Sequence, residues 1–244
     1  MRARIALVTY SGEPSLTSDD QQFQAALRAE GFEAEPVNWD ADEQWASFDA
    51  VIIRSPWDYY KRFVAYSAWL DRLEAVGARV FNPVPLLRWN SDKSYLRQLD
   101  AAGVLVPPTE WVAAGDSVNL DDLKRRRDWG QVVVKPTVSA TAYHTYRLGP
   151  QIGTGEQDRV NELCASRDIM IQPYLDEVAT AGELSLLFLG GEYSHAVLKR
   201  PRVGDFRVQS DFGGTVEPAS PSARIVDEAM RVLAAAPHSS LYAR

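Results

Sequence analysis

The chain has 244 residues, of which 45% are hydrophobic and 24% charged, and its formal net charge is −7 at pH 7. This balance is typical of a globular protein with one large domain or two. Because an acidic surface repels the phosphates of nucleic acids and of anionic lipids, the charge argues against a nucleic-acid or membrane partner.

The cysteine content and the lengths of the apolar runs indicate the cellular location of the protein. Cys164 is the one cysteine, so no internal disulfide can form, which is typical of a reducing compartment. The run Ile5–Val8 is too short for a signal peptide, and no apolar run approaches the roughly 18 residues of a membrane span. We therefore expect a cytoplasmic protein, with a homodimer as the commonest oligomeric outcome.

Strand-like and helix-like segments alternate over the first ninety residues. A capping box at Ser18–Gln21 predicts a helix that ends at Gly31, and an apolar face at 63–73 predicts a second helix that ends at Gly77. Such alternation is typical of a parallel sheet covered by helices, so we expect an α/β fold with a Rossmann-like domain at 1–90. Three short apolar runs predict the buried strands: 5–8, 51–53 and 80–81.

The pattern changes after Pro107-Pro108, which we interpret as a boundary. Before it, Asn90 is predicted to cap a short helix that runs through Leu99 and ends at Gly103. Beyond it the strands lie closer together, as in antiparallel sheets. The segments predicted there are two strands, a hairpin that turns at two glycines, and a helix: 132–136, 169–173, 184–198 and 225–233.

A lysine and a loop of small residues follow one another. Lys135 ends the apolar run Val132–Val134, where a buried strand would hold its ammonium rigidly for a phosphate contact. The alternative is a lysine whose charged end reaches solvent from a strand end. The loop Ser139-Ala140-Thr141-Ala142 would let backbone N–H groups approach an anion, although it also fits an ordinary flexible loop.

The segment Gln172-Pro173-Tyr174-Leu175 reads as a strand that becomes a linker. Adenine requires one hydrogen-bond acceptor and one donor, which the carbonyl of Pro173 and the N–H of Leu175 would supply. Proline lacks only the N–H, which this position would not use. The alternative is an edge strand that the proline terminates.

Basic residues gather near the predicted hairpin. Arg200, Arg202 and Arg207 lie close together, with Lys199 beside them. Such density in an acidic protein predicts an anion site, although a solvated strand face explains it equally well. The following Gly213-Gly214 permits a close backbone approach to a ligand.

A second polar segment, Arg54-Ser55-Pro56-Trp57-Asp58, follows the predicted strand at 51–53. In open parallel sheets, ligands bind beyond the carboxyl ends of the strands. Arg54 could therefore hold a substrate carboxylate and Asp58 a substrate amine. The alternative is a turn anchored by a buried tryptophan.

Several kinds of site are disfavoured. The chain has no Walker A loop, and Ser11-Gly12-Glu13-Pro14 stands where a dinucleotide-binding glycine motif would lie. His144, His195 and His238 lack a metal-binding spacing.

Taken together, these segments resemble the ATP-grasp superfamily, in the same order along the chain. A lysine in Asn90-Ser91-Asp92-Lys93 precedes Lys135, the segment 172–175 and Glu183. The stretch Gly204–Gln209 is similar to ribosomal-protein glutamate ligases and glutathione synthetases. Three segments look like the bacterial branch that includes the D-cycloserine ligase of antibiotic biosynthesis: Arg54–Tyr59, Arg88-Trp89-Asn90 and His195–Pro201.

The resemblance implies roles for the individual residues. Lys93 and Lys135 would contact the ATP phosphates, and the loop at 139–142 would close over them. Glu183 would bind the ribose, and the segment 172–175 the adenine. Arg207 and Lys199 would hold the γ-phosphate and the developing acyl phosphate. The residues expected on the substrate side are Arg54, Ser55, Trp57, Asp58, Gly213 and Gly214.

The resemblance also implies a reaction, domains and a metal. ATP would phosphorylate the carboxylate of a small amino acid-like substrate, and an amine or aminooxy group would attack the acyl phosphate, as in D-cycloserine-type ring closure. The implied divisions are a pre-ATP-grasp domain at 1–90, a lid subdomain at 91–175 and a C-terminal subdomain at 176–244. Family members carry Mg²⁺-binding carboxylates beyond a sequence like Leu241–Arg244, so we expect truncation, no metal ligand within this chain and reduced activity.

Two other functions stay open. The chain could be a catalytically impaired ATP-binding module that acts as a sensor or partner subunit. It could also be an NAD-dependent reductase, in which case Lys135 would not affect nucleotide binding.

Overall fold

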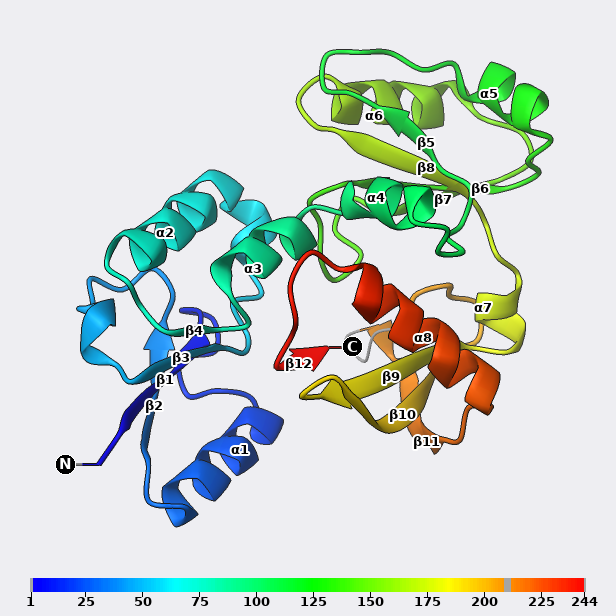
Figure 1. Ribbon diagram of the computed structural model, residues 1–244. Coiled ribbons are helices and arrows are strands. Elements are labelled where there is room, and N and C mark those ends of the chain that lie inside the picture. The colour runs from blue at the N-terminus through cyan, green and yellow to red at the C-terminus, as the bar shows by residue number, and fades with distance from the viewer. Residues whose placement is uncertain (1, 209–211, 244) are drawn as a thin grey trace. The chain divides into compact units, whose positions relative to one another are not determined.

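The computed structural model describes residues 2–208 and 212–243 (Figure 1). These residues form two compact units. Unit 1 comprises Met1–Ser91, Leu189–Gly191 and Ala236–Ala243, and unit 2 comprises Asp92–Phe188 and Glu192–Ala235. Both units combine helices with sheets, which confirms the predicted α/β class.

Unit 1 contains a parallel four-stranded sheet in the order β2-β1-β3-β4. The chain passes from β1 through α1 to β2, and then crosses to β3 on the other side of β1. The elements of this unit are β1 (Arg4–Thr9), α1 (Ser18–Ala29), β2 (Glu33–Asn38), β3 (Ala50–Ile53), α2 (Phe63–Ala75), β4 (Val80–Phe81), α3 (Val84–Ser91) and two 3-10 turns, Trp45–Ser47 and Tyr59–Lys61.

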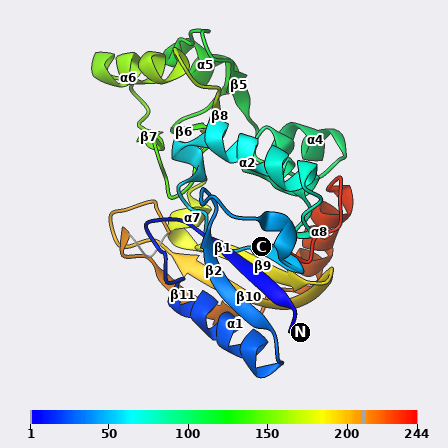
Figure 2. The ribbon, with the colours of Figure 1, turned by 90° about the vertical axis from the view of Figure 1, so that its left-hand side faces the viewer.

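Helices cover both faces of this sheet. Ile5 and Leu7 point toward α1, whereas Ala6 and Val8 point toward α2, because successive strand residues face opposite sides. All four are buried. Figure 1 and Figure 2 show α1 and α2 on opposite faces. Burial on two faces explains why the strands read as continuous apolar runs.

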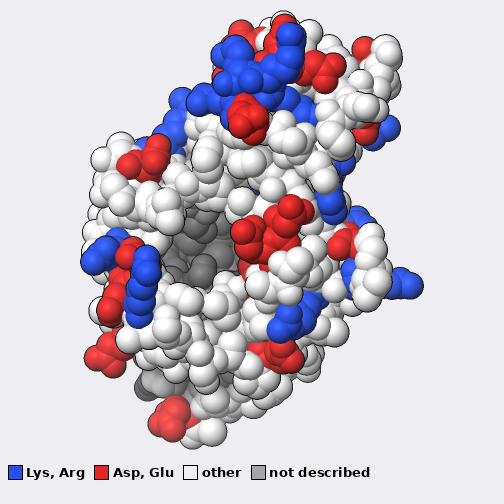
Figure 3. Space-filling view, turned by 90° about the vertical axis from the view of Figure 1, so that its right-hand side faces the viewer, with Lys and Arg blue, Asp and Glu red and all other residues white. Residues whose placement is uncertain are grey.

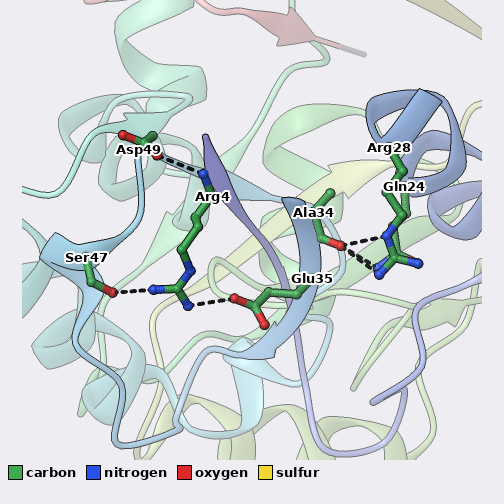
Figure 4. A network of polar contacts seen from close by, with 7 residues as sticks. All are labelled: Arg4, Gln24, Arg28, Ala34, Glu35, Ser47 and Asp49. Carbon is green, nitrogen blue, oxygen red and sulfur yellow. Dashed lines mark hydrogen bonds and ion pairs between the residues drawn. The ribbon is translucent and has the colours of Figure 1, made fainter. Parts of the chain in front are cut away.

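Arginines tie the strands of this sheet to their neighbours, as Figure 4 shows. Arg4 donates to Glu35 Oε1 at 2.8 Å and to Ser47 Oγ at 3.2 Å, and its backbone N–H donates to Asp49 Oδ2 at 2.7 Å. Arg28 donates to the carbonyl of Ala34 at 2.8 Å. These cations are therefore engaged in holding the sheet together.

Two predicted helix starts are wrong. The cap of α1 is Thr17, whose side chain accepts the N–H of Asp20, and not Ser18. Asn90 lies inside α3 instead of capping a helix that runs to Leu99. The helix breaks at 92–94, where Asp92 Oδ1 accepts the N–H of Ser94 at 2.8 Å, and α4 (Tyr95–Ala101) follows.

Unit 2 begins with an antiparallel sheet in the order β5-β8-β6-β7. One face packs against α5 and α6, with Val132, Val134, Ile169 and Ile171 in the buried core. Cys164 of α6 lies in the same core. The bounds are β5 (Glu110–Val112), α5 (Leu120–Arg127), β6 (Val132–Pro136), β7 (Tyr146–Leu148), α6 (Thr154–Cys164) and β8 (Ile169–Pro173).

Basic side chains gather over α5 (Figure 3). They belong to its last turn, where the carbonyl end of the helix favours positive charge. Lys124 donates to the carbonyl of Gly149 at 2.6 Å, and Arg127 lies 2.6 Å from Glu110 Oε2. This cluster is thus explained by the packing of the unit itself.

A second antiparallel sheet carries β9, β10 and β11. The predicted hairpin is confirmed: Gly190 and Gly191 have φ values of 61° and 85°, the region that a tight two-residue turn requires. Within the described ranges, every helix is too short or too polar to cross a bilayer. The remaining elements are α7 (Glu177–Thr180), β9 (Glu183–Leu189), β10 (Glu192–Arg200), β11 (Thr215–Ala219), α8 (Ala223–Ala235) and β12 (Tyr242–Ala243).

Candidate active site

Lys93 lies in the break between α3 and α4 and reaches the loop after β6. Its backbone N–H donates to the carbonyl of Thr137 at 2.9 Å. Its ammonium donates to the backbone carbonyl of Ser139 and lies 3.2 Å from Ser139 Oγ. Because the helix is interrupted between α3 and α4, Lys93 turns toward this loop.

Lys135 lies on the face of its sheet that is opposite the hydrophobic core. On β6, Val132 and Val134 are fully buried against the helices, so Lys135 points to the other face. Its neighbour across the antiparallel pair is Met170 of β8. Among the described residues, the ammonium of Lys135 has no hydrogen-bond or ion-pair partner.

The two lysines are close enough to repel each other. Burial and, to a smaller extent, the charge of Lys135 together lower the pKa of Lys93 to about 8, against the opposing effect of Asp92. Burial also lowers the pKa of Lys135, whereas the carboxylate of Glu183 raises it. An anion bound beside these two ammonium groups would relieve the repulsion between them.

Glu183 and Lys199 extend this charged group. Glu183 opens β9, and its Oε1 lies 3.5 Å from Lys199 Nζ on β10. The preceding Gly182 has a φ of +91°, and a Cβ there would lie 2.6 Å from the carbonyl oxygen of Lys199. Only glycine fits this close approach, which sets where Glu183 begins its strand.

The register of β8 leaves accessible the two backbone groups that are predicted to bind adenine, the Pro173 carbonyl and the Leu175 N–H. Pro173 pairs with Val132, and the N–H of Tyr174 donates to the carbonyl of Gln131 at 2.9 Å. Pro173 is thus in a non-hydrogen-bonded pair, so its carbonyl points away from β6. On that side, the pairing with β5 extends only to Ile171. Among the described residues, nothing accepts the N–H of Leu175.

Gln172 and Tyr174 support this segment by packing. Gln172 Nε2 donates to Thr109 Oγ1 at 2.9 Å. The guanidinium carbon of Arg147 lies 3.8 Å from the centre of the Tyr174 ring. The Tyr174 hydroxyl is buried without a partner in the described part of the chain.

The loop of small residues is held in an unusual conformation. Thr141 and Ala142 have φ values of 50° and 54°, in the left-handed region that side chains with a Cβ disfavour. Ser139 is buried and donates to the carbonyl of Pro136 at 3.0 Å, and the carbonyl of Ala140 accepts the N–H of Tyr143. Lys93 therefore fixes the start of a loop whose next residues are strained.

Arg207 lies in the segment after β10. Its guanidinium binds Asp205 at 2.7 Å and stacks on Phe212 at 3.7 Å. This pairing holds the pKa of the Asp205 carboxyl well below its usual range. Gly213 follows, with Arg202 packed 3.3 Å from where its Cβ would be, and then Gly214. The expected Gln209 lies outside the described residues.

Four of the predicted substrate residues, Arg54, Ser55, Trp57 and Asp58, lie in unit 1, whereas Gly213 and Gly214 lie in unit 2. Arg54 Nε donates to Asp20 Oδ1 at 2.7 Å, and Ser55 Oγ donates to Asp20 Oδ2 at 2.9 Å. Asp58 Oδ1 accepts the indole N–H of Trp39 at 2.7 Å. Trp57, in contrast, is 52% exposed, so it is not the buried anchor of a turn.

Comparisons with known proteins identify the family of this chain. The family described as "D-cycloserine synthetase DcsG, N-terminal domain" matches residues 5–82. The cycloserine biosynthesis protein DcsG of Streptomyces lavendulae is 35% identical over 200 residues, which cover 80% of this chain and 67% of that protein. The chain belongs to the DcsG family of ATP-grasp ligases.

Solved structures place this ATP-grasp ligase among relatives of the same fold. The crystal structure of D-cycloserine synthetase DcsG matches 96% of this chain and 80% of its own, at 32% identity and a TM-score of 0.85. A D-alanine–D-alanine ligase from Bacillus anthracis matches 98% of this chain and 80% of its own, at 15% identity and a TM-score of 0.69. The chain is thus an ATP-dependent carboxylate–amine ligase, as the resemblance implied.

The ATP-grasp ligase also contains site residues that sequence reasoning missed. Asp20 was read only as part of a helix start, although its side chain is buried against Arg54. Tyr242 was noted only for its place near the chain end, yet its ring lies 5.4 Å from the Arg54 guanidinium carbon. No local pattern reveals either contact, because both join distant parts of the chain.

The implied cofactors are ATP and Mg²⁺. The ammonium groups of Lys93 and Lys135 fit the negative charge of a triphosphate, and the carboxylate of Glu183 fits the hydroxyl donors of a ribose. For Mg²⁺, no group of three or more His, Cys, Asp or Glu that could hold a metal ion occurs in residues 2–208 and 212–243.

Proposed function

We propose that this ligase forms an amide-type C–N bond on a small amino acid-like substrate through an acyl phosphate, as in D-cycloserine-type ring closure. The relatives named for cycloserine synthesis support the substrate class. The observation that carries the proposal is the convergence of the Lys93 and Lys135 ammonium groups, with Glu183 beside them.

The proposed reaction has two balanced steps. A carboxylate oxygen of the substrate attacks the γ-phosphorus of ATP, the bond to the bridging oxygen breaks, and ADP leaves. An amine or aminooxy nitrogen then attacks the carbonyl carbon of the acyl phosphate. The C–N bond forms, phosphate leaves with the former carboxylate oxygen, and the nitrogen releases a proton. Catalysis of this kind depends mainly on positioning and charge neutralisation.

Each group of the nucleotide has a proposed partner in unit 2. Lys135 and Lys93 contact the phosphates, and the loop at 139–142 covers them. The Pro173 carbonyl and the Leu175 N–H bind the adenine edge, and Glu183 accepts hydrogen bonds from the ribose. Lys199 and Arg207 neutralise the transferred phosphoryl group, together with Gly213 and Gly214 near the acceptor.

The proposed roles require two side chains to change partners. Lys199 must share its charge between Glu183 and a phosphate, and Arg207 must turn from Asp205. Mg²⁺ is proposed as a further charge partner of ATP, although the described residues contain no group of three or more His, Cys, Asp or Glu side chains that could hold it. The cytoplasmic location and the homodimer stay predictions.

An oxygen-label experiment tests the acyl phosphate. The substrate is β-aminooxy-D-alanine, the open-chain amino acid whose ring closure gives D-cycloserine, with ¹⁸O in its carboxylate. We expect ATP-dependent release of phosphate that carries one ¹⁸O, and loss of this release in Lys135→Met. ATP binding without phosphate release would instead support the nucleotide-binding module, and unlabelled phosphate would contradict the acyl phosphate.

A further inference from the structure

Arg54 lies at the carboxyl end of β3 in the sheet of unit 1. Its backbone N–H and that of Ser55 both donate to the carbonyl of Val8, at 3.1 and 3.0 Å. This is the carboxyl end of β1 and β3, the two strands between which the chain reverses its direction of winding. In open α/β sheets, ligands bind at this switch point.

Asp20 fixes the guanidinium from one side. Its carboxylate is 4% exposed and uses one oxygen for Arg54 Nε and the other for the Ser55 hydroxyl. The residue itself sits in the first turn of α1, where Thr17 accepts its N–H at 3.2 Å. A buried carboxylate with both oxygens bonded cannot turn away, so Arg54 keeps its orientation.

Two aromatic rings bound the guanidinium. Phe23 of α1 lies 5.3 Å from the guanidinium carbon and Tyr242 lies 5.4 Å from it. The Tyr242 hydroxyl donates to the carbonyl of Ile53, at the end of β3. Burial raises the pKa of Tyr242 to about 12, so this hydroxyl keeps its proton at neutral pH.

Asn82 brings Tyr242 to this position. Its Oδ1 accepts the N–H groups of Leu241 at 2.6 Å and Tyr242 at 3.3 Å, and its Nδ2 donates to the Tyr242 carbonyl at 2.9 Å. The segment is 160 residues further along the chain. Asn82 directly follows β4, so the sheet itself anchors the returning segment.

The remaining edge of the Arg54 guanidinium has no hydrogen-bond partner among residues 2–208 and 212–243. A guanidinium has five N–H groups in a fixed plane, and the described residues accept only the one on Nε. The side chain is 29% exposed. The Nη1 and Nη2 edge of a guanidinium whose orientation is already fixed is suited to a carboxylate, because two parallel hydrogen bonds form without loss of side-chain freedom.

We propose that the Nη edge of Arg54 binds the carboxylate of the substrate, and that Asp20, Asn82 and Tyr242 are positioning residues for it. We call this group, with Phe23, the Arg54 site. The identity of the carboxylate as that of the ligase substrate rests on the proposed function. The competing interpretation is an ion pair that only stabilises unit 1.

Calorimetric binding distinguishes the two interpretations without requiring turnover. The probes are β-aminooxy-D-alanine and its carboxamide, which differ in the charged group alone. We expect the wild-type chain to bind the carboxylate at least ~10-fold more tightly, since hydrogen bonds to charged groups are the strong ones. In Arg54→Lys, which lacks the two-pronged edge, and in Asp20→Asn, which weakens the ion pair that orients it, this preference should fall to about twofold or less.

Arg4→Lys is the matched control. Arg4 also pairs with a carboxylate, that of Glu35 at 2.8 Å, and lies 4.6 Å from an aromatic ring, that of Phe48, in the same unit. It should keep the full preference for the carboxylate. Thermal unfolding of each variant shows whether it is folded, and Asp20→Asn serves if Arg54→Lys is not.

Three outcomes would overturn the Arg54 site: no binding of the carboxylate to the wild type, an equal affinity for both probes, or an unchanged preference in the folded Arg54 and Asp20 variants. Phosphate release is measured separately with the same samples. A chain that binds the carboxylate through Arg54 but releases no phosphate would contradict the proposed function and leave the Arg54 site standing.

Discussion

Lys93 Nζ lies 3.2 Å from Ser139 Oγ, although 46 residues separate them in the chain. The same ammonium also binds the Ser139 carbonyl. Lys93 therefore does two things: it supplies positive charge beside Lys135, and it pins the start of the 139–142 loop. A triphosphate in the site would compete with Ser139 for this ammonium, so we expect nucleotide binding and loop position to be coupled.

Removing either ammonium should weaken ATP binding. We expect Lys135→Met to raise the Kd for ATP on the order of 10- to 100-fold, because a charge-assisted phosphate contact in a partly buried site is lost. Lys93→Met should do the same and also release the loop. Calorimetric titration with ATP measures both, and Lys61→Met, at a cation in unit 1 beside the ring of Tyr60, is the control. An unaltered Kd in both variants would contradict the phosphate roles.

The affinity for ATP should fall as the pH rises through about 8. Below that value Lys93 is protonated and attracts the phosphates, and above it the lysine of the unliganded protein loses its charge. Bound ATP favours the charged form and raises the pKa of Lys93, so the Kd should rise by at most about tenfold per pH unit between the two pKa values.

Lys93→Arg is the control for this pH dependence. An arginine stays protonated throughout the range, so its Kd for ATP should change less than that of the wild type from pH 7 to pH 9, and any remaining slope would come from Lys135, whose pKa burial also lowers. Titrations in matched buffers measure both proteins. A wild-type profile as flat as that of the arginine variant would exclude Lys93 as the titrating group.

Local patterns predicted the elements of unit 1 well. The apolar runs at 5–8 and 51–53 became β1 and β3 because both faces of these strands are buried. The helix breaks were harder. Asn90 is a good cap by residue type, yet Val84, Leu86 and Ser91 are buried along α3 and extend that helix past it. Packing against unit 1 thus outweighed the local capping preference.

The residues predicted to bind ATP could not be assigned from local patterns alone. Lys93, Lys135 and Glu183 were assigned by resemblance, since no spacing rule joins residues so far apart. The structure brings them together, whereas their roles toward ATP stay predictions. The Arg54 site was only partly visible, because Asp20 and Tyr242 meet Arg54 through tertiary structure.

Gly182 should be sensitive to the smallest substitution. In Gly182→Ala, the added Cβ would lie 2.6 Å from the Lys199 carbonyl oxygen at a φ of +91°. We expect a loss of about 1–3 kcal/mol in the free energy of unfolding, and weaker ATP binding because Glu183 moves. Gly155→Ala in α6 meets nothing within 4 Å and should be neutral or stabilising. Urea unfolding compares them, and equal stabilities would contradict the close approach.

Asn82 should hold the returning segment locally. In Asn82→Ala, three hydrogen bonds to Leu241 and Tyr242 disappear, which we expect to cost about 1–3 kcal/mol. Hydrogen exchange of the Leu241 and Tyr242 amides should then accelerate, whereas the β1 amides stay protected. Because Tyr242 bounds Arg54, the same variant should bind β-aminooxy-D-alanine more weakly and ATP as before. Unchanged exchange at both amides would show that other contacts hold the segment, and Asn82 would then have no positioning role.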